Sequence, residues 1–192
     1  YSLIDFRGGD PSGLEGNDTS NLTPFLNDEV FNFSYGNPDD GDRIIDSQWA
    51  TSSIYKSTVM NNQRCMFGVN FADGRIKCYP LEKTFFVIFV RGEAYGNNSF
   101  GQTSENAVTD DATGLMWQRN DSQQGMIWSE ALTYCNDLDL EGYTDWRLPN
   151  AKELQSIIDY SRSPDTTNSP AIDPLFSTST ITNEAGQLDY PM

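Results

Sequence analysis

The alternation of apolar and polar residues is clearest between residues 44 and 80, where it predicts β-strands. Two alternating runs, residues 67–71 and 75–79, flank the pair Asp73 and Gly74. An Asp-Gly pair between alternating runs is a strong signal for a β-hairpin with a short turn. We therefore expect two antiparallel strands joined by one turn in this region.

The longest uninterrupted apolar run covers residues 85–90 and predicts a third strand, over residues 84–91, that is buried. Six residues are far too few to cross a bilayer, so the run does not predict a membrane span. A loop is expected over residues 92–106. Strand character then resumes over residues 107–117, with a turn at Gly114.

Two amphipathic helices are expected further along the chain. The first spans about residues 128–139, where apolar residues recur at helical spacing. The second begins after Pro149, because Asn150 is a credible N-cap and Glu153, three residues later, completes a capping-box pattern. The apolar faces are formed by Trp128, Ala131, Leu132, Cys135 and Leu138 in the first helix and by Leu154, Ile157 and Ile158 in the second.

Charge and composition narrow the function. The 192 residues include 28 Asp and Glu against 12 Lys and Arg, a formal net charge of −16. A chain this acidic repels phosphate backbones and anionic lipids. Nucleic-acid binding is therefore not expected. The chain contains no His, which removes imidazole metal ligands and every His-based catalytic triad. With no recognisable nucleophile motif either, we expect a non-enzymatic protein with no catalytic residues.

The three cysteines, Cys65, Cys78 and Cys135, leave at least one thiol without a partner in this chain. If Asp73 and Gly74 form a two-residue turn, Cys65 and Cys78 lie roughly 13 Å apart, too far for a disulfide. A longer or bulged turn would bring them together, so the pairing stays open. Three cysteines without His match no recognised zinc spacing.

An acidic turn at Asp39, Asp40 and Asp42 offers oxygen ligands beside Gly41, which makes these three carboxylates calcium candidates. The spacing does not match the twelve-residue EF-hand loop and lacks its distal Glu. A solvated turn is the simpler interpretation, and apart from this calcium candidate no cofactor is expected.

Three segments resemble the Lcl C-terminal domain family, a family named for a bacterial collagen-like adhesin. Residues 110–118, 128–135 and 142–154 match its pattern in the right order, including the sequence Gly-Tyr-Thr-Asp-Trp-Arg-Leu-Pro-Asn at 142–150. Residues 67–76 resemble the hairpin near the end of the same domain, and residues 89–92 resemble its closing strand.

The order of these segments implies the end of one unit followed by the start of another: residues 1–92 as the C-terminal part of a first Lcl-like unit and residues 93–192 as the N-terminal part of a second. A short echo of residues 1–6 at residues 155–160 agrees with such a tandem arrangement. The resemblance implies a β-rich α+β fold that is C-type-lectin-like, with a twisted antiparallel sheet and two helices. The family's closing strand often carries a Cys that could pair with the helix Cys, and here residues 89–92 have none, so Cys135 lacks that partner.

The motif residues have a structural and a functional interpretation. Trp117 and Trp128 could stack on sugar rings, but their apolar surroundings favour the core. Trp146 is likewise expected to be buried, and Arg147 to pair with a carboxylate near the start of the second helix. The residues expected to carry the structural motif are Trp117, Trp128, Trp146, Arg147, Asn150 and Glu153.

The sequence therefore predicts an extracellular or cell-surface bacterial module, adhesin-like and non-enzymatic, that binds a glycan or a protein partner through residues it does not identify. The net charge argues against a sulfated glycan. The alternative is a structural subunit of a head-to-tail filament, because chains cut in mid-unit expose edges that pair with one another. The lectin-like fold is shared with formylglycine-generating enzymes, which is an analogy of fold alone.

Overall fold

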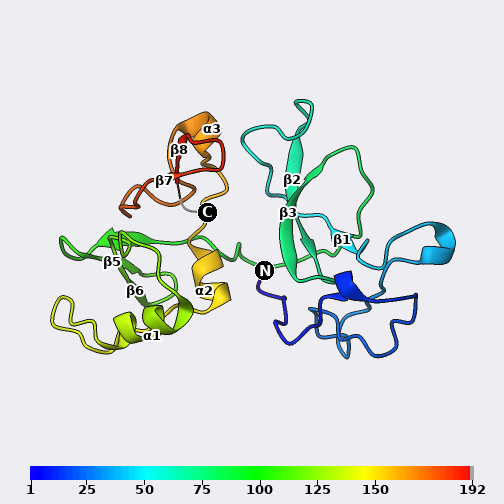
Figure 1. The fold of residues 1–192 in the computed structure, drawn as a ribbon, viewed down its shortest axis with the longest axis horizontal. Helices are drawn as coiled ribbons and strands as arrows, with labels where there is room; N and C mark the ends of the chain where they lie inside the picture. The colour runs from blue at the N-terminus through cyan, green and yellow to red at the C-terminus, as the bar shows by residue number, and fades with distance from the viewer. Residues whose placement is uncertain (191–192) are drawn as a thin grey trace. The chain divides into compact units, whose positions relative to one another are not determined.

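A computed structural model describes residues 1–190 of the chain, which separates into two units: Tyr1–Arg91, here unit 1, and a second unit that begins at Gly92, here unit 2. Both are built on short antiparallel sheets, and the helices are few and short (Figure 1). The chain is therefore α+β and rich in β-structure, which confirms the fold class predicted from the sequence at this level of detail.

Unit 1 is organised around a three-stranded antiparallel sheet of order β1-β2-β3. Two single turns of 3-10 helix, η1 and η2, lie on the segments that precede the sheet. The bounds are η1 Pro11–Gly13, η2 Pro38–Asp40, β1 Gln48–Trp49, β2 Cys65–Asn70 and β3 Arg75–Pro80.

The turn between β2 and β3 is four residues long, not two. Asn70 pairs with Arg75, so residues 71–74 form the turn. The side-chain oxygen of Asn70 accepts a hydrogen bond from the Ala72 N–H at 2.9 Å, and its carbonyl accepts one from the Gly74 N–H at 2.9 Å. Gly74 has a φ of 71°, a left-handed conformation that glycine adopts without strain. Of the two turn lengths that the sequence left open, the longer one forms, because the Asn70 side chain starts the turn earlier.

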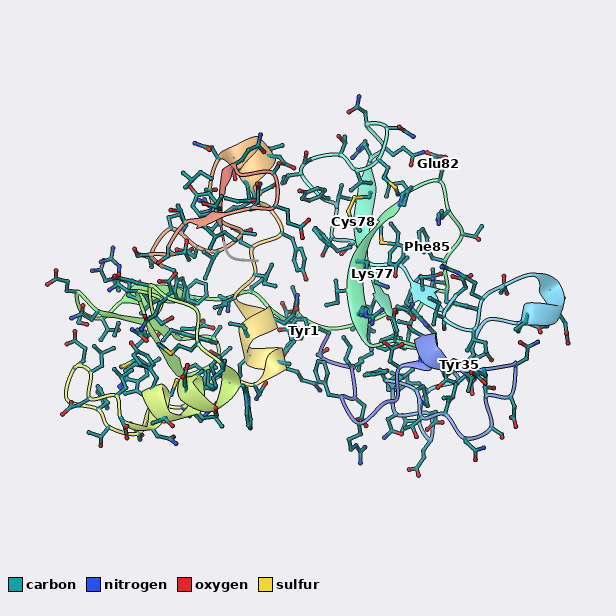
Figure 2. All side chains as sticks on the ribbon, in the orientation of Figure 1. Tyr1, Tyr35, Lys77, Cys78, Glu82 and Phe85 are labelled. Atoms are coloured by element: carbon teal, nitrogen blue, oxygen red, sulfur yellow. A yellow bond between two sulfur atoms is a disulfide. The ribbon has the colours of Figure 1, made fainter. Side chains whose placement is uncertain are left out.

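This longer turn brings the two cysteines of unit 1 together. Cys78 lies opposite Phe67, only two residues along β2 from Cys65, and the two cysteine Cα atoms are 5.6 Å apart. Cys65 and Cys78 form a disulfide, which Figure 2 shows on the β2–β3 hairpin beside Cys78. The alternative that the sequence left open, a longer turn that permits the bridge, is the one the structure contains.

The core of unit 1 lies between the sheet and the irregular N-terminal segment. Ile4, Leu26, Val69 and Phe71 are buried together, with partly buried aromatic side chains around them. Backbone hydrogen bonds hold the layers in place: the Phe25 N–H donates to the Phe71 carbonyl at 2.8 Å. A segment without strands is thus held to the sheet by apolar packing and a few backbone bonds.

The apolar run at residues 84–91 is neither a ladder strand nor buried. Only Phe86 makes a bridge, parallel to Trp49, and among the described residues 87–91 make no backbone hydrogen bond. Phe89 is 90% exposed and Val90 is 99% exposed. The predicted buried strand is wrong because β1, the strand it would extend, is only two residues long and offers a partner to Phe86 alone.

Unit 2 has two antiparallel sheets, one of order β4-β5-β6 and one of β7 with β8, and three helices. The helix predicted over residues 128–139 is present and ends at Asn136. The bounds are β4 Phe100–Gln102, β5 Ala107–Asp110, β6 Leu115–Gln118, α1 Trp128–Asn136, α2 Ala151–Ser156, α3 Pro164–Thr167, β7 Ile181–Thr182 and β8 Leu188–Asp189.

The turn between β5 and β6 repeats the geometry of the turn in unit 1. Asp110 pairs with Leu115, its side chain accepts from the Ala112 N–H at 3.1 Å, and its carbonyl accepts from the Gly114 N–H at 2.8 Å. Asp110 is buried; burial alone would raise its pKa, but hydrogen bonds from Ser99 and its other neighbours outweigh this and lower the pKa. The carboxylate is a structural centre of the turn and not a free ligand.

We expect the Cys65–Cys78 disulfide to stabilise unit 1 by about 3 kcal/mol, because it closes a loop of 13 residues in the unfolded chain. Dithiothreitol should lower the free energy of unfolding of the wild type by about that amount. The Cys65→Ala/Cys78→Ala variant should start at the lower value and not respond to reductant. Hydrogen exchange of peptides from residues 65–80, measured across a urea series, gives the comparison; equal sensitivity of both proteins to reductant would contradict it.

Candidate functional site

An open apolar groove is the main concave feature of unit 2. It has a volume of about 850 Å³ and is bordered by β6, by both larger helices and by the segment that contains Phe176. No residue of α1 or α2 is buried, because no strand covers the apolar faces that these helices present. The apolar side chains that line the groove include Met116, Trp117, Ala131, Cys135, Leu138, Trp146, Ile157 and Phe176.

One wall of the groove is β6, the edge strand of its sheet. The Arg119 N–H donates to the Asn106 carbonyl at 2.8 Å, and the antiparallel register then makes Trp117 and Leu115 the residues that bond to β5. The backbone groups of the alternate residues, Met116 and Gln118, therefore point away from β5. Within the described part of the chain no strand pairs with this side of β6, so two N–H and two C=O groups are open for pairing.

The start of α2 forms the polar rim of the groove. The Asn150 side chain accepts from the N–H groups of Lys152 and Glu153, and Glu153 accepts from the Asn150 N–H at 2.8 Å, so the predicted capping box is present. Arg147 forms a two-pronged ion pair with Glu153, with distances of 2.6 and 2.7 Å. This hydrogen bonding from Arg147, together with that from Asn150, lowers the pKa of Glu153 to about 2.

The three tryptophans of unit 2 have different surroundings. Trp146 is partly buried and its indole N–H donates to the Leu140 carbonyl at 3.3 Å. Trp117 lies on β6 with its indole nitrogen buried and without a hydrogen-bond partner among the described residues. Trp128 is 75% exposed, so the prediction that it belongs to the core is wrong. It occupies the first position of α1, and it does not line the groove.

The calcium candidates lie in unit 1, around η2. Asn37 donates from its side chain to Asp40 at 2.7 Å and accepts from the Asp39 N–H at 3.1 Å, while Asp42 accepts from the Asn37 N–H at 3.4 Å. These bonds account for the acidic residues as parts of a capped turn. Over residues 1–190 no group of three or more His, Cys, Asp or Glu is placed to hold a metal ion. Calcium binding by this turn stays a prediction.

Cys135 is a free thiol on α1 and lines the groove. Burial raises its pKa, so at neutral pH it is a neutral, weakly nucleophilic side chain. It contributes a small apolar surface to the groove.

No helix in the described part of the chain is long and apolar enough to span a membrane.

Unit 2 is thus a small α+β domain whose apolar groove runs beside an unpaired strand edge. Comparison with known families agrees with the resemblance noted from the sequence: residues 106–190 match the Lcl C-terminal domain. This segment, which runs from β5 to β8, belongs to that family. The match covers less than half of the chain and does not include unit 1. No curated protein and no solved structure matches the chain.

Of the residues predicted for the apolar helix faces, five line the groove and three do not, and the groove itself was not predicted. Those that line it are Ala131, Cys135, Leu138, Leu154 and Ile157; those that do not are Trp128, Leu132 and Ile158. The sequence also did not identify Met116 and Gln118 as an open edge, because that depends on the exact register of β6 with β5. The contribution of Phe176, far along the chain from β6, had no local signal. The capping-box pattern at Asn150 was the one site feature with a sequence signature specific enough to predict in atomic detail.

We expect Glu153→Gln to destabilise unit 2 by about 1–2 kcal/mol at pH 7, because it weakens both the ion pair with the exposed Arg147 and the helix cap. The folded-state pKa of Glu153 is below the ordinary value of 4.5, so the stabilisation is complete above pH 4.5 and is lost as the pH falls towards about 2. Unfolding monitored by tryptophan fluorescence between pH 2 and 7 measures the difference. The exposed Glu184→Gln is the control, and a gap between Glu153→Gln and wild type that is constant with pH would refute the assignment.

Proposed function

We propose that the chain is an extracellular, non-enzymatic, adhesin-like binding module whose groove in unit 2 binds an extended segment of a partner protein. The observation that carries this proposal is the pairing of an apolar groove with an open strand edge at Met116 and Gln118. An extended peptide added to such an edge gains main-chain hydrogen bonds, while its alternate side chains enter the adjoining groove.

The chemistry of unit 2 favours a protein segment over a glycan. Its groove is lined mainly by apolar side chains, which suit the alternate apolar side chains of an extended protein segment. From residue 92 to the end the chain has 16 Asp and Glu but only 4 Lys and Arg, a net charge of −12. That charge disfavours sulfated or otherwise anionic glycans and favours a partner segment that carries cations.

The proposal also covers where the protein is located, which fold it has and whether it needs a cofactor. The family of residues 106–190 is named for an adhesin domain, and the Cys65–Cys78 disulfide is compatible with an oxidising compartment outside the cytoplasm. We propose that the arrangement is C-type-lectin-like and that the protein works without a cofactor. The absence of His from the sequence supports binding over catalysis.

A second candidate, a structural subunit that assembles head to tail, is favoured by one observation. The apolar residues 87–90 of unit 1 are exposed and without backbone partners among the described residues, and such segments pair with other chains.

The groove is tested by Ala131→Arg, which places a long charged side chain in its lining. The full chain, immobilised, is exposed to a library of phage-displayed peptides and, separately, to a glycan array. We expect enrichment of extended apolar peptides with flanking cations, and at least tenfold weaker binding to Ala131→Arg.

The matched control is Ala185→Arg, which adds the same charge at an exposed turn outside the groove and should bind like wild type. Circular dichroism verifies that both variants are folded. Binding of glycans alone, or peptides that bind Ala131→Arg as well as wild type, would refute the protein-segment proposal.

A further inference from the structure

Residues 85–90, here the donor segment, have the surface of a buried strand but are largely exposed. All six residues are apolar, so both faces of an extended strand would be apolar, which is typical of a strand covered on both sides. Yet Val87 is 57% exposed, Phe89 90% and Val90 99%. A continuous apolar surface of this kind marks an interaction site.

The donor segment is held to unit 1 only where it begins. The Phe86 N–H donates to the Gln48 carbonyl and its own carbonyl accepts from the Ala50 N–H, both at 2.9 Å. The ring of Phe85, which Figure 2 shows on the segment that follows the hairpin, packs edge-on against Tyr79 with centroids 6.0 Å apart. The segment is therefore anchored at one end, while its last four residues keep their backbone groups unpaired.

The groove of unit 2 has the features that such a strand needs. Residues 115–118 of β6 expose the N–H and C=O groups of Met116 and Gln118, and the groove beside them is apolar. At about 3.3 Å per residue, the four unpaired donor residues 87–90 span roughly 13 Å, which matches the length of the four-residue β6. Added along this edge, the donor segment would pair its backbone and place alternate side chains against α1 and α2.

Charge complements this fit. Residues 56–91, which include the donor segment, have 6 Lys and Arg against 2 Asp and Glu, a net charge of +4. Lys83 and Arg91 flank the donor segment on either side. Unit 2, which carries the groove, has a net charge of −12. Unit 1 as a whole has a net charge of −4, so the attraction to acidic unit 2 is local, from Lys83 and Arg91 beside the donor segment, and acts against the repulsion between two copies of net charge −16.

We propose that the donor segment of one copy adds as a strand to β6 of a second copy and fills its groove. This inference rests on the proposed function, because it names the partner of the same groove. Each copy carries one donor and one acceptor, so the contact joins different surfaces of the two molecules. Such contacts propagate into open chains unless the geometry closes a ring.

Complementation between two variants of the full chain tests this pairing. Phe89→Lys/Val90→Lys disables the donor at residues that are already exposed, and Ala131→Arg disables the acceptor. Light scattering should show wild-type mass rising with concentration, while each variant alone stays monomeric, with association at least a hundredfold weaker. Mixed in equal amounts, the two variants should form a one-to-one dimer and nothing larger, because only one donor and one acceptor remain intact.

The control for the donor variant is Val30→Lys/Met60→Lys, which adds the same charge at exposed apolar residues of unit 1 outside the donor segment. It should assemble like wild type, and loss of assembly in this control would attribute association to general apolar contact and overturn the proposal. Mixed variants that stay monomeric would also overturn the proposal. A monomeric wild type that still binds displayed peptides through the groove overturns self-association alone, whereas loss of peptide binding as well removes the proposed function.

Discussion

The register of both hairpins depends on one interaction, a side-chain oxygen at the end of the first strand that accepts a backbone N–H two residues on. Asn70 does this in unit 1 and Asp110 in unit 2, and each turn then closes on a glycine in the left-handed conformation. In unit 1 the resulting register brings Cys65 to Cys78. In unit 2 it decides which residues of β6 bond to β5 and which face the groove.

The groove exists because the helices of unit 2 present apolar faces that nothing in the described part of the chain covers. In an ordinary domain those faces would be closed by a further strand, and helix residues would be buried. Here Ile157, just after α2, is buried, while Leu154 is 54% exposed. The donor segment in unit 1 shows the converse situation, a strand-like sequence that no sheet accepts. The uncovered groove of unit 2 and the exposed donor segment of unit 1 are both apolar.

The net charge has a different meaning when it is divided along the chain. Taken as a whole, the net charge of −16 indicates only that the protein is acidic. Along the sequence, residues 56–91 have a net charge of +4 and unit 2 has −12, and Lys83 and Arg91 are the cations that flank the donor segment. The charge of unit 2 supports the proposal of a protein segment as the ligand over that of a polyanion.

Local patterns in the sequence were sufficient for the capping box at Asn150, a carboxylate partner for Arg147 near the start of α2, the start of α1 and the presence of both hairpins. Each of these depends on residues within a few positions of one another. Burial was not determined locally. Residues 84–91 have the composition of a buried strand and Trp128 lies on an apolar stripe, yet both are exposed, since burial requires a second element that the sequence of the segment cannot supply. The disulfide and the open edge of β6 were also decided by the tertiary structure. Both follow from a strand register that the side chains of Asn70 and Asp110 set, and a shift of register changes every cross-strand neighbour.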